Sequence, residues 1–226
     1  YRRLDQRCTF FRERRYILCL DRNDNDLLGQ VQSQLAPQPA HPAQAFIQRV
    51  LPAHSSTRER VPILPRFFQE CLAELGEVGS VLDIACGLNP LAIPWMPLKP
   101  GFTYTACDIY SDMVGFLNQF FEHFQVNGKA LLADVTQTIP DVDAELTLVL
   151  KTIPCLEQVD KSAGERLLDT IQAEHILVSF PARSLGGRSK GMPQNYEARF
   201  RALTAGRPWR IQRFEFTSEL VFLVSR

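Results

Sequence analysis

The stretch Val81-Leu82-Asp83-Ile84-Ala85-Cys86-Gly87-Leu88-Asn89-Pro90 decides the expected fold of this chain. Its first residues form an apolar run typical of a buried strand. Gly87 then permits close backbone approach to a ligand, and Pro90 suits the first turn of a helix. A strand-to-helix turn with one glycine is common and mostly structural, so this stretch alone is a weak indication of ligand binding.

Apolar runs and helical patterns alternate on both sides of this turn. The runs predict five parallel strands, at Ser80–Ala85, Tyr104–Asp108, Ala130–Ala133, Leu146–Lys151 and Ile176–Phe180. Apolar residues at helical spacing predict helices over Pro62–Leu75, Met113–Phe124 and Leu167–Ile171. Two β-rich runs, Ile211–Phe216 and Leu220–Val224, predict a C-terminal antiparallel hairpin. The pattern indicates a Rossmann-like α/β fold, a doubly wound sheet that binds ligands at the carboxyl ends of its strands.

Two aspartates follow the next two predicted strands. Asp108 lies 21 residues after Gly87, where a carboxylate accepts hydrogen bonds from both ribose hydroxyls, as it also does in NAD enzymes. Asp134 follows the third strand, in a position to accept from an adenine amino group. Each acid read alone is equally well a helix N-cap or a solvated loop residue. Together with the Gly87 turn they favour a class I S-adenosylmethionine-dependent methyltransferase.

Composition places further limits on the class of protein. The 226 residues are enough for one main domain, and their six cysteines lack the paired spacings of zinc sites or disulfide frameworks. No apolar stretch reaches the roughly 18 residues that span a bilayer. We therefore expect a soluble cytoplasmic protein without a metal.

The formal net charge of zero conceals an uneven distribution of charge. Residues 1–77, 78–180 and 181–226 carry net charges of +2, −8 and +6. Basic ends on an acidic centre are typical of a polyanion-binding surface, and a solvated face is the alternative interpretation.

Four segments make the chain resemble a known family. They are His54–Arg60, Val81–Leu91, Cys107–Ile109 and the long loop Ser179–Met192, with its Phe-Pro, Gly-Gly-Arg and Lys-Gly-Met elements. In these segments the chain resembles the aminoglycoside-resistance 16S ribosomal RNA (guanine(1405)-N7)-methyltransferases. The resemblance spans most of residues 54–226.

The resemblance implies a role for individual residues at the cofactor. Arg60 pairs with the methionine carboxylate, Asp108 holds the ribose, and Leu150 lies near the transferred methyl. The full implied cofactor set is His54, Ser55, Ser56, Arg60, Ala85, Gly87, Asp108, Asp134, Val135 and Leu150.

The resemblance also implies residues on the acceptor side. Lys151 and Glu157 are expected beside the target guanine. Arg183, Arg188, Lys190 and Met192 are expected to contact RNA, together with Arg199, Arg201 and the N-terminal arginines. The implied partner is 16S rRNA within the 30S subunit, bound by a monomer.

Guanine N7 carries a free lone pair, so its methylation needs no general base and no catalytic residue is assigned. Catalysis is then mainly alignment of the reacting atoms with an extruded base. The segment Leu150–Pro154 lacks the Asp/Asn-Pro-Pro-aromatic box of exocyclic adenine methylation. The Pro154-Cys155 pair is read as structural rather than as the nucleophile of a cytosine-C5 enzyme.

The expected domains are residues 1–53, a small helical rRNA-docking region, and residues 54–226, the methyltransferase domain. We expect the first to be truncated, because it begins at Tyr1 and is shorter than the family's helical N-terminal domain. Two alternatives remain at this stage. One is a methyltransferase of the same fold that acts on another RNA or a small molecule, and the other is a noncatalytic cofactor- or RNA-binding module.

Overall fold

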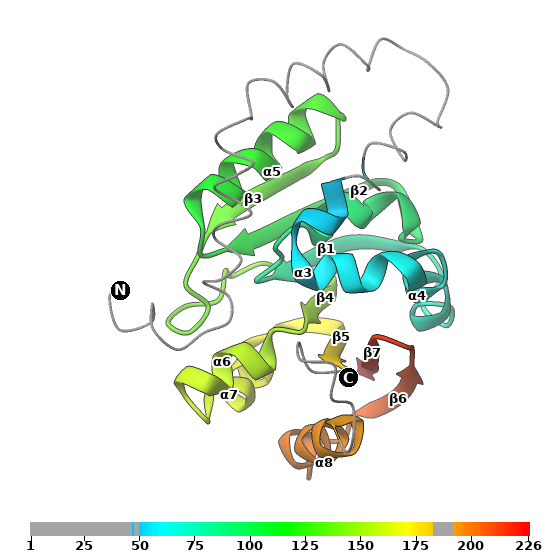
Figure 1. The fold of residues 1–226 in the computed structure, drawn as a ribbon, viewed down its shortest axis with the longest axis vertical. Coiled ribbons are helices and arrows are strands. Elements are labelled where there is room, and N and C mark those ends of the chain that lie inside the picture. Colours follow the sequence, from blue (N-terminus) through cyan, green and yellow to red (C-terminus); the bar gives the residue numbers. More distant parts are fainter. Residues whose placement is uncertain (1–46, 48–49, 183–191) are drawn as a thin grey trace.

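One mixed sheet of seven strands organises the protein (Figure 1). The computed structural model describes Ile47 and residues 50–182 and 192–226. The strand order is β3-β2-β1-β4-β5-β7-β6. Strands β1 to β5 pair in parallel, and β7 pairs antiparallel with both β5 and β6. The order reverses between β1 and β4, so the ends of these strands form the crevice in which such sheets bind ligands.

Strands and helices alternate along most of the described chain, but no helix separates β3 from β4 or β6 from β7. The strands are β1 (Val78–Ile84), β2 (Leu98–Asp108), β3 (Gly128–Leu132), β4 (Ala144–Leu150), β5 (Ala173–Pro181), β6 (Arg210–Glu215) and β7 (Glu219–Ser225). The α-helices are α3 (Ser55–Arg60), α4 (Leu64–Cys71), α5 (Ser111–His123), α6 (Ile153–Val159), α7 (Ala163–Thr170) and α8 (Met192–Thr204). The 3₁₀ helices within the described residues are η2 (Leu51–Ala53), η3 (Val61–Ile63) and η4 (Asn89–Trp95).

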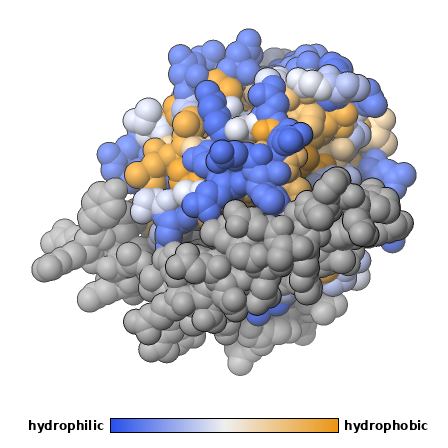
Figure 2. All heavy atoms as spheres, turned by 90° about the horizontal axis from the view of Figure 1, so that it is seen from above, coloured by the Kyte–Doolittle hydropathy of each residue, from blue (hydrophilic) through white to orange (hydrophobic). Residues whose placement is uncertain are grey.

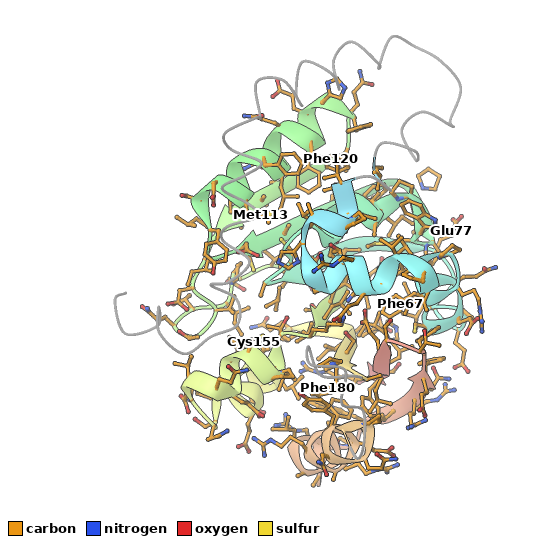
Figure 3. All side chains as sticks on the ribbon, in the orientation of Figure 1. Phe67, Glu77, Met113, Phe120, Cys155 and Phe180 are labelled. Atoms are coloured by element: carbon orange, nitrogen blue, oxygen red, sulfur yellow. The ribbon has the colours of Figure 1, made fainter. Side chains whose placement is uncertain are left out.

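Helices cover both faces of the sheet, because successive strand residues point to opposite sides. In β1, Val81 packs with α4, η4 and α5, whereas Leu82 and Ile84 pack with α6, α7 and α8. Figure 3 shows Phe67 on α4 and Phe180 close to α8, from these two different layers. The result is a three-layer sandwich with an apolar cluster on each side of the sheet.

The predicted Rossmann-like α/β fold is confirmed, with all five parallel strands and the C-terminal hairpin in place. Three local predictions were wrong. The helix expected over Pro62–Leu75 is divided between η3 and α4, which ends at Cys71. The helix after Gly87 is the 3₁₀ helix η4, since Pro94 inside it has no N–H to donate. Strand β2 begins at Leu98, well before Tyr104.

The helix α8 was not predicted, because its sequence consists mostly of polar or small residues and has few large apolar ones. Within the described ranges, no helix is both long and apolar enough to cross a membrane, and no cluster of three or more metal-ligating side chains occurs.

Candidate cofactor and acceptor site

The turn that leaves β1 has an unusual backbone that brings amide groups to the sheet edge. Ala85 and Gly87 have φ angles of 51° and 52°. A non-glycine residue rarely adopts this left-handed region, so Ala85 is held there by its surroundings. The amide of Cys86 donates to the carbonyl of Cys107 at 3.0 Å, which fixes the turn to the end of β2.

Asp108 is bonded directly to this turn. Its Oδ2 accepts from the amide of Gly87 at 2.9 Å, and its Oδ1 accepts from the amide of Tyr110 at 3.2 Å. Burial raises the pKa of this carboxyl, while the bonds from Gly87 and Tyr110 oppose the shift. The carbonyl of Asp108 also accepts from Ala133 at 2.9 Å. The ends of β1, β2 and β3 are therefore joined in one row.

Asp134 stands just beyond that row and shapes its own loop. Its Oδ1 accepts from the amide of Thr136 at 3.0 Å and from its hydroxyl at 2.6 Å, and its Oδ2 accepts from Gln137 at 2.8 Å. Such side-chain bonds to the following backbone are typical of Asx turns. Val135 is partly buried against the cluster beneath α6 and α7.

His54 closes the Gly87 turn from the other side. The buried imidazole shares a 2.8 Å hydrogen bond between Nδ1 and the hydroxyl of Ser56. A Cβ added to Gly87 would lie 2.9 Å from His54 Cε1. Glycine is therefore required here for space as well as for its φ angle. The backbone of Ser55 begins α3, and its side chain is not among the described ones.

Arg60 lies in a buried polar network that spans the chain. Its Nε and Nη2 donate to the two oxygens of Glu219 at 2.8 and 3.0 Å, and its Nη1 donates to Asn89 at 2.8 Å. Its guanidinium also lies 4.9 Å from the ring centre of Phe67. The resemblance assigns the Arg60 guanidinium to the cofactor carboxylate. In this structure two nitrogens of that guanidinium donate to Glu219 instead.

The network continues to Asp83. Its Oδ2 accepts from Asn89 at 2.9 Å and from the Tyr104 hydroxyl at 2.7 Å. Its buried Oδ1 has no partner among the described residues. Burial raises the pKa of Asp83 to about 6 against these two hydrogen bonds. A buried carboxylate oxygen without a hydrogen bond costs free energy. A further hydrogen-bond donor beside Oδ1 of Asp83 would therefore be favourable.

Lys151 follows the last residue of β4 and points into the same region. Its φ angle is 58°, and its Nζ lies 2.6 Å from Glu59 Oε2, 3.4 Å from the carbonyl of Ser56 and 3.5 Å from Glu219 Oε1. The preceding Leu150 is buried at the strand end. Lys151 therefore ties α3 to the ends of β4 and β7.

Asp108, Asp134 and the glycine turn lie at one edge of the sheet, and comparison with known proteins identifies the family to which this site belongs. The sequence matches the model of the family described as "Ribosomal RNA methyltransferase (FmrO)" over residues 16–223. The chain belongs to this ribosomal RNA methyltransferase family. The membership confirms the family to which the sequence motifs pointed.

Curated members of the family are clearly similar to this chain. A 16S rRNA (guanine(1405)-N(7))-methyltransferase of Micromonospora echinospora is 37% identical over 200 residues, covering 88% of this chain and 73% of that protein. One from Frankia casuarinae is 41% identical over 183 residues, covering 80% and 64%. The chain thus spans about two thirds of the length of these relatives.

Solved structures of the family share the fold. The 16S rRNA methyltransferase RmtF in complex with S-adenosyl-L-homocysteine is 28% identical, with a TM-score of 0.73 and coverage of 89% of this chain and 76% of that chain. The 16S rRNA methylase ArmA is 29% identical, with a TM-score of 0.67 and coverage of 89% and 96%.

In this family member, Glu157 faces α8. Arg199 donates from Nε and Nη2 to Glu157 Oε1 at 3.0 and 2.6 Å, and its Nη2 also donates to the carbonyl of Lys161 at 3.0 Å. The structure thus joins α6 to α8 through Glu157. Cys155, half-buried in α6 (Figure 3), donates its Sγ–H to the carbonyl of Lys151 at 3.6 Å.

The described C-terminal arginines are paired within the protein. Besides Arg199, they form ion pairs or hydrogen bonds as follows: Arg201 with Glu197, Arg207 with Asp169, Arg210 with Glu74, Arg213 with Glu197 and Glu215, and Arg226 with the carbonyls of Leu168 and Ile171. Figure 2 shows hydrophilic side chains beside apolar ones on the described part of one face. Arg183, Arg188 and Lys190 lie outside the described residues, as does the side chain of Met192.

Sequence reasoning missed two carboxylates of the site. Glu219 is fully buried although it adjoins an apolar run, and this contrast was the one signal available for it. Glu59 lies in the segment His54–Arg60, but sequence reasoning assigned it no role. Its contact is with Lys151, 92 positions away, and no local pattern relates the two residues.

Proposed function

We propose that this chain transfers a methyl group from S-adenosylmethionine to N7 of a decoding-site guanine in 16S rRNA of the 30S subunit, which confers aminoglycoside resistance. The observation that carries the proposal is Asp108, buried at the end of β2 and bonded to the Gly87 turn, in a chain of this methyltransferase family. The named activity of the relatives and the S-adenosyl-L-homocysteine in the RmtF structure support it.

The residues present fit S-adenosylmethionine. The left-handed turn at Ala85 and Gly87 presents its backbone at the sheet edge, and the unpartnered Oδ1 of Asp83 offers a buried acceptor among the described residues. Asp108 has lone pairs left for ribose hydroxyls, and Asp134 follows at the adenine side. The remaining members of the proposed cofactor set are His54, Ser55, Ser56, Arg60, Ala85, Val135 and Leu150. S-adenosyl-L-homocysteine is the expected product.

The cofactor supplies an electrophilic methyl group on its sulfonium, and guanine N7 supplies the lone pair. The protein therefore has to orient the two partners and exclude water, without removing a proton. Leu150 gives an apolar wall at the strand end, and the row from Gly87 to Asp108 fixes the cofactor. The base leaves its stack to reach the site.

The acceptor side of the proposal comprises Lys151, Glu157, Arg183, Arg188, Lys190 and Met192. Surface ion pairs contribute little stability, so arginines such as Arg199 and Arg201 can exchange a carboxylate for a phosphate. Residues 1–53 serve as the rRNA-docking region and residues 54–226 as the methyltransferase domain. The chain acts as a monomer in the cytoplasm, where its substrate is found.

The test measures methyl transfer from labelled cofactor to purified 30S subunits. The modified base is located by chain cleavage specific for 7-methylguanosine. Asp108→Ala should weaken cofactor binding about 10- to 100-fold, the effect of losing charge-assisted hydrogen bonds. Asp141→Asn, an exposed carboxylate, is the control.

Expression in a susceptible bacterium gives an independent readout. Resistance to gentamicin and kanamycin without resistance to apramycin is expected. Cofactor binding without methylation of 30S subunits would refute the proposed acceptor and favour another RNA or a small molecule.

A further inference from the structure

We infer that Glu59 and Lys151 together read the Watson–Crick edge of the guanine that receives the methyl group. This inference rests on the proposed function and assigns a residue, Glu59, to the acceptor side of the site. It begins from where the acceptor must lie. The proposed cofactor runs from Asp134 after β3, past Asp108 on β2, to Gly87 on β1. Its methyl-bearing end therefore points toward β4, the next strand of the sheet.

At the end of β4 the structure places a donor and an acceptor side by side. Lys151 Nζ lies 2.6 Å from Glu59 Oε2, and the two side chains are 9% and 35% exposed. The Lys151 side chain is thus nearly buried, whereas the Glu59 side chain is partly exposed to solvent. Among the described residues, Oε2 of Glu59 receives the bond from Lys151, and no hydrogen bond reaches Oε1.

This arrangement complements guanine. The edge of guanine presents an acceptor, O6, beside two donors, N1–H and the N2 amino group. An ammonium can donate to O6 while a carboxylate accepts from N1–H and N2–H. Adenine presents a donor where guanine has O6 and an acceptor where guanine has N1–H. The pair therefore selects guanine, as expected for a flipped base read on its Watson–Crick edge.

The carboxylate also favours the reaction itself. Methylation of N7 places a positive charge on the base and makes N1–H more acidic. The hydrogen bond from N1–H to Glu59 strengthens as that charge develops, so it stabilises the transition state more than the bound substrate.

Glu157, the other carboxylate near this edge, is less suited to this task. Both of its oxygens accept from Arg199, at distances between 2.6 and 3.3 Å. Its side chain is 13% exposed. A base that used Glu157 would have to displace the guanidinium of Arg199 from both carboxylate oxygens, whereas Oε1 of Glu59 receives no hydrogen bond from the described residues.

The test is a double-mutant cycle that combines the substitution of Glu59 with a change in the target base. Single-turnover methylation is measured at saturating cofactor for the wild-type protein and Glu59→Ala. The substrates are 30S subunits that carry either guanosine or inosine at the target position. Inosine keeps O6 and N1–H but lacks the N2 amino group. Glu70→Ala is the control, since Glu70 pairs with exposed Arg66 on the neighbouring helix.

We expect Glu59→Ala to slow methylation of guanosine subunits about 10- to 100-fold, with cofactor affinity and melting temperature close to wild type. The wild type should prefer guanosine over inosine, and the variant should not. Glu70→Ala should match the wild type throughout.

Three results distinguish the possible failures. A wild-type protein that methylates no 30S subunits refutes the proposed function. An active wild type with an equally fast Glu59→Ala variant refutes the role of Glu59 alone. A slower variant that keeps the full preference for guanosine shows that Glu59 only holds Lys151, which also overturns the inference.

Discussion

Removing the carboxylate of Glu219 should cost more stability than removing any surface carboxylate. Arg60 and Glu219 have side chains that are 3% and 0% exposed, and two of the Arg60 nitrogens donate to Glu219. Glu219→Ala leaves the guanidinium buried with Asn89 as its remaining hydrogen-bond partner. Breaking a buried pair by removing one partner costs about 3–5 kcal/mol. For a chain of this size the melting temperature should fall by roughly 6–20 °C.

The assay is urea unfolding with a thermal melt of the same samples. Glu74→Ala is the matched control, because it also breaks a carboxylate–arginine pair, with Arg210, but at 52% and 68% exposure. Exposed pairs contribute about 0–1 kcal/mol. If the two variants lose the same small amount of stability, the buried network does not hold α3 against the hairpin and the reasoning fails.

Three other substitutions test separate features. Gly87→Ala should destabilise the protein and weaken cofactor binding in calorimetry more than Gly101→Ala, which has a similar positive φ but no atom within 4 Å of a Cβ. Asp83 has a folded pKa of about 6 against 3.8, so the folded state holds its proton more tightly and stability falls by about 3 kcal/mol as pH rises through this window. Asp83→Asn should remove that slope, and an unchanged slope in urea titrations from pH 4 to 7 would contradict the assignment. Phe200→Ala should cost about 3–5 kcal/mol in the same titrations, because its buried ring stacks on Phe222 at 4.2 Å, and a loss near 1 kcal/mol would show that α8 packs loosely.

The centre of the sheet was predictable because its strands are buried on both faces and stand out as apolar runs. The run Leu146–Leu150 is an example, buried at all five positions. Helix α8 was not predictable in this way, since its core contacts are confined to a few residues such as Phe200 and Leu203. Pro94, which lies inside the helix expected after the glycine turn and has no N–H to donate, favours the observed 3₁₀ helix.

Residues of the site were predictable only where they lie at the ends of neighbouring strands. Gly87 follows β1 and Asp108 ends the neighbouring strand β2, so the sequence already placed both residues at one edge of the sheet. Arg60 and Glu219 are 159 residues apart, and no periodic pattern relates them. Their pairing depends on how α3 and the hairpin pack on the same sheet, which is a property of the tertiary structure.

The residues on either side of the basic segment 183–191 contact the methyltransferase core, which bears on how Glu157 should be interpreted. On one side, the amide of Ala182 donates to the carbonyl of Ser218 at 2.9 Å in the hairpin turn. On the other side, α8 is held by Arg199 on Glu157 and by the ring of Tyr196, 5.1 Å from that of Phe180. Loss of Glu157 would remove one of the contacts that hold α8, the helix that follows this segment. A drop in RNA methylation at Glu157 therefore does not by itself place its carboxylate against the base, whereas the guanosine–inosine comparison at Glu59 does test such a contact.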